Sequence, residues 1–316
     1  MSLRNLISTA KGEFKTSNLD ITEENLANHL EDYRDIISYW RVYPDKFIDY
    51  LVSIDPNCNF KFYFAQRIAL RVFMRYKTVF ATCSRGFSKS FIAVMALMLK
   101  CILYPGARIA TTSSGKSQSA SILSSKLAEI CQLIPALANE IMWDTRGKPQ
   151  QTTQSRDQVS YVFKNGSILT NCAMTETSRG LRFQALLVEE CAKVDQEKLT
   201  EIIMPMLVVS RKVNGKTDPH EVLNQSAVFV TSAGFKNSYS YEKLINTLCM
   251  MVAKPEEAFI FGFSWRCPVV EGLQPENFIQ QQEQDTSMDE ASFTREYKQE
   301  LYSINMVNCW KPLKVA

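Results

Sequence analysis

Residues 83–90 (Cys-Ser-Arg-Gly-Phe-Ser-Lys-Ser) constrain the fold of this chain most strongly, because they lie between two apolar stretches. The stretch before them, Thr78–Ala81, is typical of a buried strand, and Phe91–Leu99 after them is typical of a buried helix. A strand, a tight loop ending in Lys-Ser and a helix is the order found in phosphate-binding loops. The usual G-x-x-x-x-G-K-[ST] pattern would have glycine where Cys83 and Ser88 stand. A basic turn that caps a core helix is therefore the alternative interpretation.

A pair of acidic residues follows a second apolar stretch further along the chain. Ala185–Val188 is predicted to be a buried strand, and Glu189 and Glu190 come directly after it. A nucleotide-hydrolysing site needs donors around the phosphates, a carboxylate in the Mg²⁺ shell and a group that polarises water. In this interpretation Lys89 contacts the β/γ-phosphates, the Ser90 hydroxyl and Glu189 hold Mg²⁺, and Glu190 polarises water. The alternative is that the two acids begin a solvent-exposed helix.

Strands alternate with helices from residue 79 onward, which predicts a parallel sheet with crossover connections. Arg108–Thr112 and Ala227–Val230 are further strands, and a helix capped by Ser113-Ser114 should follow the first of them. The segments 161–163 and 167–169 flank Lys-Asn-Gly as a hairpin. Because ligands collect at the carboxyl ends of strands, we expect the loop at 84–90, the two acids and the Thr-Ser-Ala-Gly segment at 231–234 to converge on one crevice.

The two ends of the chain have a different pattern. Three helices are predicted before the first strand, over about residues 20–40, 44–54 and 62–76. Beyond residue 235 the alternation weakens, and Phe259–Phe263 with the Gln/Glu-rich stretch after it suggests a smaller second lobe. The predicted domains are a helical extension at 1–58, a core at 59–235 and a small C-terminal subdomain at 236–316.

Composition narrows the function only slightly. The net charge of +3 is too small to indicate or exclude a nucleic-acid partner. Nine cysteines without a C-x-x-C pair and only two histidines argue against a zinc cluster and suggest reduced thiols. The first fifteen residues lack the apolar core of a signal peptide, and no apolar run is long enough to span a bilayer, so a soluble intracellular protein is expected.

Several motifs together resemble one known family, the ATPase domain of the large terminase subunit of tailed bacteriophages. The resemblance covers most of the chain and rests on the following segments: Trp40–Phe47, Phe64–Arg67, Ser84–Arg85, Lys164–Ser167, Ser178–Gly180, Leu187–Ala192, Thr231–Gly234 and Phe293–Tyr297. Some positions depart from the family pattern. Cys83 and Ser88 replace glycines of the usual loop, Glu189 stands where aspartate is usual, and Tyr43-Pro44 stands where asparagine-proline is commoner.

The resemblance implies an α/β fold of the ASCE type of P-loop NTPase, with a mainly parallel central sheet flanked by helices and with ATP and Mg²⁺ as cofactors. It implies that Gln66 recognises adenine and that Arg85 joins Lys89 and Glu190 in catalysis. The remaining residues carried over are those that hold the nucleotide, Ser84, Gly86, Phe87, Ser88 and Ser90, and those that link phosphate release to movement, Thr231, Ser232 and Ala233.

The resemblance further implies a motor that translocates double-stranded DNA into a procapsid in the cytoplasm of the infected bacterial host. Its partners would be DNA, the portal protein and the small terminase subunit, in a homo-oligomeric ring, with no membrane contact. No alternating sheet follows Trp310, so no nuclease activity is expected from this segment. Two rivals stay open, namely a helicase-like or remodelling nucleic-acid ATPase and a catalytically inactive P-loop adaptor.

Basic residues outside the loop supply further candidates. An arginine that reaches the nucleotide of a neighbouring subunit would be one of Arg146, Arg156, Arg179 and Arg182. Contacts to the DNA backbone are expected from residues 146–148, Arg211-Lys212 and Lys216, because translocation needs contacts that ignore base sequence. Solvated loop charges are the alternative for all of them.

Overall fold

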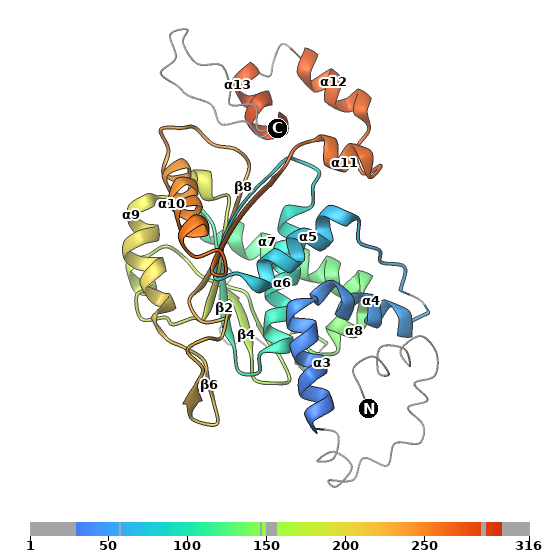
Figure 1. The fold of residues 1–316 in the computed structure, drawn as a ribbon, viewed down its shortest axis with the longest axis vertical. Coiled ribbons are helices and arrows are strands. Elements are labelled where there is room, and N and C mark those ends of the chain that lie inside the picture. Colours follow the sequence, from blue (N-terminus) through green and yellow to red (C-terminus); the bar gives the residue numbers. More distant parts are fainter. Residues whose placement is uncertain (1–29, 57, 146, 150–156, 286–288, 299–316) are drawn as a thin grey trace.

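The computed structural model describes residues 30–298, except for 57, 146, 150–156 and 286–288. Its centre is a seven-stranded sheet of order β3-β4-β2-β5-β8-β1-β9 (Figure 1). All neighbours pair in parallel except β3 and β4, which form the hairpin predicted from the sequence. The strands span β1 (Thr78–Cys83), β2 (Arg108–Thr112), β3 (Ser160–Val162), β4 (Ile168–Asn171), β5 (Ala185–Glu189), β8 (Ser226–Thr231) and β9 (Ala258–Phe263).

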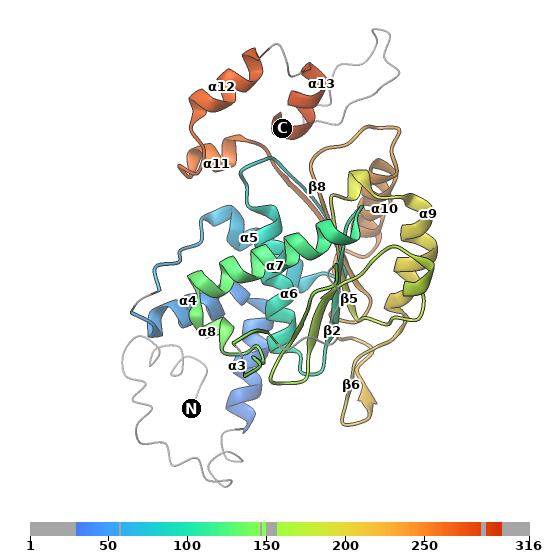
Figure 2. The ribbon, with the colours of Figure 1, turned by 180° about the vertical axis from the view of Figure 1, so that it is seen from behind.

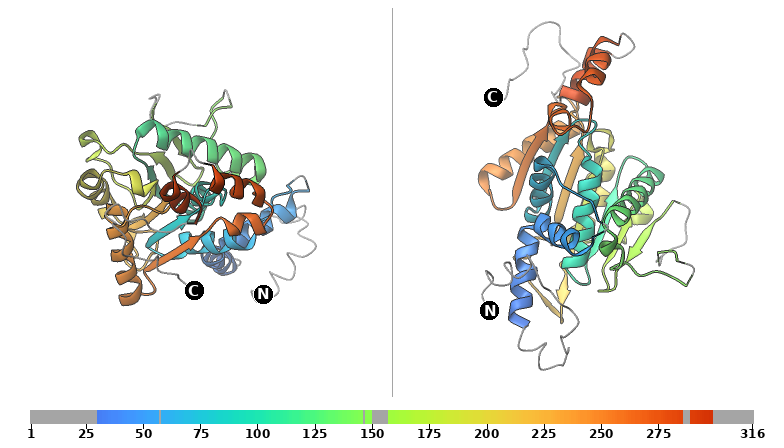
Figure 3. Two further views of the ribbon diagram at one scale, coloured as in Figure 1. Left: turned by 90° about the horizontal axis from the view of Figure 1, so that it is seen from above. Right: turned by 90° about the vertical axis from the view of Figure 1, so that its right-hand side faces the viewer.

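Helices cover both faces of the sheet (Figure 3). Alternate residues of β1 show how the two layers arise: Val79 and Ala81 belong to one apolar core and Phe80 to the other, since successive strand side chains point to opposite faces. One face carries α5 (Phe64–Arg75), α6 (Lys89–Leu103), α7 (Lys116–Leu133) and α8 (Pro135–Ala138). The other carries α9 (Gln196–Lys198), the helical turns that follow it up to Val208, and α10 (Tyr239–Ala253).

Helix α6 is the central helix of the larger core. Every residue from Phe91 to Cys101 is buried, as the unbroken apolar run predicts. Lys100 is the one charged residue in that stretch, and its Nζ donates a hydrogen bond to Ser226 Oγ at 2.8 Å. Burial lowers the pKa of Lys100 to about 7. The helix thus combines a strong apolar driving force with one buried amine.

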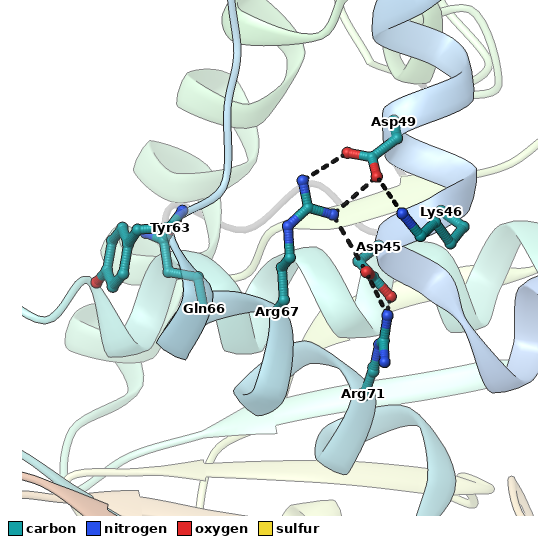
Figure 4. Close-up of polar contacts among 7 residues, drawn as sticks. All are labelled: Asp45, Lys46, Asp49, Tyr63, Gln66, Arg67 and Arg71. Carbon is teal, nitrogen blue, oxygen red and sulfur yellow. Dashed lines mark hydrogen bonds and ion pairs between the residues drawn. The ribbon is translucent and has the colours of Figure 1, made fainter. Parts of the chain in front are cut away.

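The N-terminal helices α3 (Leu30–Val42) and α4 (Pro44–Ile54) pack against α5. The predicted start of the first helix, near residue 20, lies outside the described residues. Asp45 of α4 is fully buried and accepts hydrogen bonds from Arg71 at 2.7 and 2.8 Å and from Arg67 at 3.1 Å (Figure 4). Arg67 also makes two hydrogen bonds of 2.8 Å to Asp49. These ion pairs fix the position of α5, which leads into β1.

The C-terminal part differs from the sequence-based prediction in one respect. Phe259–Phe263 was expected in a smaller lobe, but β9 pairs with β1 along its full length and extends the central sheet, so that expectation is wrong. Its aromatic side chains meet Phe73, Tyr76 and Phe87 from the main core. The domain limits themselves stay a prediction.

A small helical lobe follows β9. It consists of α11 (Arg266–Val270), α12 (Glu276–Gln284) and α13 (Glu290–Phe293), and its own apolar cluster contains Ile279, Phe293 and Tyr297. The lobe lies beyond the carboxyl ends of β1 and β8, as two opposite views show (Figures 1 and 2). It is therefore placed directly over the loop at 84–88.

Two smaller findings complete the fold. Helix α7 begins at Lys116 after Gly115, and no side chain caps it; Ser113 donates instead to the Gly115 carbonyl, so the predicted Ser113-Ser114 cap is wrong. In the described residues, no helix combines the length and the apolar character that crossing a bilayer requires.

Candidate functional site

The loop between β1 and α6 has the backbone of an anion-binding turn. Gly86 has φ +84°, and Ser88 has φ +65°. The left-handed conformation costs a residue with a Cβ about 1–2 kcal/mol, which explains why glycine is usual at the position of Ser88. An added Cβ at Gly86 would also lie 2.7 Å from Gln274 Oε1 of the C-terminal lobe, so the end of that side chain would have to move. The first N–H groups of α6 are directed toward the loop, where the helix dipole favours an anion.

Ser90 and Glu189 meet at the ends of α6 and β5. The Ser90 hydroxyl donates to Glu189 Oε2 at 3.2 Å. The other carboxylate oxygen, Oε1, is buried and has no hydrogen-bond partner within the described residues. Burial raises the pKa of Glu189 to about 7, against the opposing effects of Ser90 and Lys89. A hydroxyl and a carboxylate oxygen that lacks a partner are suitable donors for Mg²⁺, which takes one or two carboxylates together with substrate phosphates. The two residues therefore fit the predicted metal site.

Glu190 stands at the turn that follows β5 and also has a left-handed backbone, with φ +51°. Lys193 Nζ lies 3.0 Å from its Oε2 atom. Burial favours a raised pKa, but the hydrogen bonds with Lys193 and Gln118 outweigh it and lower the pKa of Glu190. Glu190 is therefore an ionised carboxylate at neutral pH, held by two neighbours.

Two cavities flank the loop, and Arg85 and Lys89 line both. The first has a volume of about 300 Å³ and is lined by residues of the segment 84–91 and by Lys126 of α7. The second, of about 250 Å³, is lined by Lys89, Glu190, the segment 231–235 and the C-terminal lobe. Lys89 and Glu190 thus face one cavity, and the ends of β1, β5 and β8 converge on it as the sequence predicts.

The C-terminal lobe contacts the loop through Glu296. The backbone N–H of Arg85 donates to the Glu296 carbonyl at 3.2 Å, and Arg85 Nε donates to Glu296 Oε2 at 3.1 Å. Arg295, next to Glu296, lines the second cavity and places its guanidinium 4.1 Å from the centre of the Phe235 ring. Sequence reasoning assigned no site role to Glu296, Arg295 or Lys126. Arg295 and Glu296 lie in the motif segment 293–297, but that motif did not indicate a contact with the loop, and no motif contains Lys126.

Gln66 lies near the start of α5, and Tyr63 lies between it and the loop. The Gln66 side chain is buried and its Oε1 accepts a hydrogen bond from the Tyr63 N–H at 3.4 Å (Figure 4). The Tyr63 hydroxyl in turn donates to the Phe87 carbonyl of the loop. Gln66 is not among the lining residues of either cavity. The structure connects it to the loop through Tyr63, and its role toward adenine stays a prediction.

The segment after β8 also borders the site. Ser232 and Ala233 line the second cavity together with Thr231, whose Oγ1 accepts a hydrogen bond from the Ala192 N–H at 3.2 Å. Ala192 follows Glu190 by two residues, so the ends of β5 and β8 are joined next to that carboxylate. A movement at the end of β5 would therefore be transmitted through this hydrogen bond to the end of β8.

The basic residues predicted for other roles lie in different places. Arg179 pairs with Glu176, Arg182 donates to the carbonyls of Arg179 and Leu181, and neither lines the two cavities. Arg146 and Arg156 lie outside the described residues. The prediction that Arg211 contacts DNA is wrong, because Arg211 is only 7% exposed and forms a buried ion pair with Glu221.

Lys212 and Lys216 remain exposed on the short hairpin of β6 (Lys212–Val213) and β7 (Lys216–Thr217). This hairpin lies at the end of the molecule opposite the C-terminal lobe (Figure 1). Any contact that it makes with DNA would therefore be remote from the loop.

The strand order defines the class of protein. The loop strand β1 is separated from the acid strand β5 by β8, and β9 lies on the other side of β1. With a mainly parallel sheet, helices on both faces and a loop with left-handed Gly86 and Ser88 leading into a buried helix, the chain has an α/β P-loop NTPase fold.

Solved structures with a similar fold include large terminases of bacteriophages. The ATPase domain of the Thermus phage P74-26 large terminase matches with a TM-score of 0.56 and 15% identity, over 81% of this chain and 98% of that domain. A thermophilic bacteriophage large terminase in complex with ADP matches with a TM-score of 0.53 and 9% identity, over 77% and 54% of the two chains. The bacteriophage HK97 large terminase gives 0.52 and 12%, over 75% and 50%.

This chain therefore spans about half the length of the last two proteins. No protein-family model and no curated protein matches it. The similarity establishes that the chain has the fold of the terminase ATPase domain.

Proposed function

We propose that this protein is the ATPase motor of viral DNA packaging and hydrolyses ATP to translocate double-stranded DNA into a procapsid. The observation that carries the proposal is the second cavity, in which Lys89 of the loop faces Glu190 at the end of β5. The terminase fold supports it, and terminases of this fold have been solved with ADP and with ATP-gamma-S.

The loop residues bind the triphosphate. Lys89 and the N-terminus of α6 contact the β/γ-phosphates. Arg85 reaches the terminal phosphate once its ion pair with Glu296 has opened. Ser90 and Glu189 hold Mg²⁺. The metal ion, when bound, neutralises charge that develops on the phosphate oxygens. Glu189 must lose its proton to serve as a ligand, and its raised pKa therefore couples metal binding to proton release.

Glu190 orients the attacking water and accepts its proton. The carboxylate is ionised at neutral pH, as a base must be, but Lys193 and Gln118 occupy its oxygens. Catalysis therefore requires that at least one of these contacts opens when the nucleotide is bound. Thr231 and Ser232 lie beside Glu190 at the end of β8 and are the residues through which loss of phosphate would move the C-terminal lobe.

The partners follow from the same proposal. They are double-stranded DNA, the portal protein and the small terminase subunit, with several copies of this chain in a ring in the cytoplasm of the bacterial host. Arg179 and Arg182 are the described candidates for an arginine that acts on a neighbouring subunit. Arg179 pairs with Glu176, and Arg182 donates to backbone carbonyls of the same exposed segment. Either guanidinium can therefore leave its present partner at little cost in free energy.

The test uses two variants and one control of the full chain. Lys89→Ala should weaken binding of Mg-ADP and abolish turnover, whereas Glu190→Gln should keep binding and abolish turnover. Glu197→Gln removes an exposed acid of α9 and should change neither. Calorimetry measures the affinity, and phosphate release measures turnover, with DNA present. Unchanged turnover in both site variants would refute the proposal.

The inactive adaptor is the second candidate, and one observation favours it. Both Arg85 and Glu190 are held in ion pairs that a working site would have to break. A protein that binds Mg-ADP but shows no turnover with DNA present would be an adaptor. Turnover that depends on Glu190 would exclude this alternative.

A further inference from the structure

Among the residues that the structure describes, Lys126 is the one lining the first cavity that does not come from the loop segment 84–91. It stands in the middle of α7, which packs beside α6 (Figure 2). Helix α7 contains neither the loop motif at 83–90 nor the acidic motif at 187–192. The fold therefore brings a cation from a separate element to the cavity that Lys89 and Ser90 also line.

The ion pair that holds Lys126 is weak. Its Nζ lies 2.8 Å from Glu129 Oε2, one turn later on α7, and the two side chains are 36% and 46% exposed. Exposed pairs at this spacing contribute only about 0–1 kcal/mol. A phosphate group carries more charge than a carboxylate and offers more acceptor oxygens, so it competes favourably with Glu129 for the ammonium group.

Arg85 also borders the first cavity, but it already has a partner in the C-terminal lobe. Both its backbone N–H and its guanidinium contact Glu296. Within the part of the chain that the structure describes, Lys89 and Lys126 are then the two lysines that border the first cavity.

We propose that Lys126 is a second cationic contact to the phosphates of the bound nucleotide, made from α7 and within the same chain as the loop. This inference rests on the proposed nucleotide site. The ammonium group of Lys126 leaves Glu129 and binds a phosphate oxygen instead. A lysine suits this role because its charge is compact and mobile and does not need a fixed planar geometry.

The experiment measures the affinity of the full chain for Mg-ADP and Mg-ATP-gamma-S by calorimetry. Lys126→Ala should raise the dissociation constant about tenfold, in the range expected for a charge-assisted contact. Lys126→Arg should retain most of the affinity. Lys254→Ala is the matched control, because Lys254 forms an exposed ion pair with the glutamate three residues later but lies at the end of α10. It should leave the affinity unchanged.

Glu129→Gln tests the exchange directly. It removes the competing carboxylate, so affinity should increase about twofold to threefold. The thermal midpoint of each variant without nucleotide should stay within about 2 °C of the wild type, since surface changes alter stability little. An Ala variant that binds as tightly as the wild type would overturn the inference.

The inference and the proposed function can fail separately. If Lys89→Ala weakens binding and Lys126→Ala does not, the nucleotide site stands and the role of Lys126 is wrong. If neither lysine affects binding, the nucleotide site itself is wrong. A loss in Lys126→Ala that Lys126→Arg does not restore, accompanied by a fall in thermal midpoint, would assign Lys126 a structural role instead.

Discussion

The buried amine of Lys100 should make the stability of this protein depend on pH. Its ordinary pKa is 10.5, and burial lowers it to about 7 in the folded protein. A difference of that size corresponds to at most about 5 kcal/mol of folding free energy. Between these two values the unfolded chain carries the proton and the folded chain does not. Stability therefore rises with pH across this range, by up to about 1.4 kcal/mol per pH unit.

Lys100→Met keeps the volume of the side chain and removes the titrating group. Above pH 10.5 the wild type and the variant should differ little, apart from the Ser226 hydroxyl, which loses its donor at a cost of about 1 kcal/mol. Toward pH 7 the wild type should lose stability relative to the variant. The variant should therefore be more stable by about 2–4 kcal/mol near neutral pH, since relaxation and water penetration reduce the upper limit.

Urea unfolding at pH 7, 8 and 9 in a reducing buffer measures this difference. Lys254→Met, at an exposed lysine, is the control and should follow the wild type at every pH. The expected result is a gap between Lys100→Met and the wild type that narrows as pH rises. A gap of the same size at all three pH values, or a variant less stable at pH 7, would refute the reasoning.

Two further predictions concern the candidate site. Because the pKa of Glu189 is about 7, binding of Mg-ADP should release about three quarters of a proton at pH 6.5 and almost none at pH 8.5. Calorimetry in buffers of different ionisation enthalpy measures this release, and Glu189→Gln should abolish it. Glu296→Gln removes the ion pair with Arg85 and so frees the guanidinium for the nucleotide. Because the Arg85 side chain is mostly exposed, this ion pair is weak, and affinity for Mg-ATP-gamma-S should rise only about twofold to fivefold. Equal affinities in titrations of the variant and the wild type would show that Glu296 does not compete with the nucleotide.

Much of the fold was predictable from local patterns. The apolar run at Phe91–Leu99 predicts α6, Lys-Asn-Gly at 164–166 predicts the hairpin, and the alternation of strands and helices predicts a parallel sheet. The loop at 84–90 and the two acids at the end of β5 were likewise found as motifs. Each of these signals depends on neighbours within about ten residues, which is the range over which backbone geometry and hydrophobic periodicity act.

Contacts between distant segments were not predictable in the same way. Phe259–Phe263 has the composition of a strand. Its pairing with β1 depends on β1 having an unpaired edge in the sheet that the other strands form. Arg211 and Lys126 are both basic residues without a motif, yet one is buried against Glu221 and the other borders the loop. A sequence records the charge of such residues, but their burial and partners depend on elements that pack from elsewhere in the chain.

The sequence by itself determined that this protein has a phosphate-loop strand and helix, an acidic strand end and a predominantly parallel sheet, because these are properties of short segments. Only the tertiary structure decided that Arg211 is buried against Glu221, that Glu296 holds Arg85, and that β9 belongs to the central sheet. The physical reason is that charge interactions and strand pairing depend on distance in space, which the order of residues along the chain does not fix.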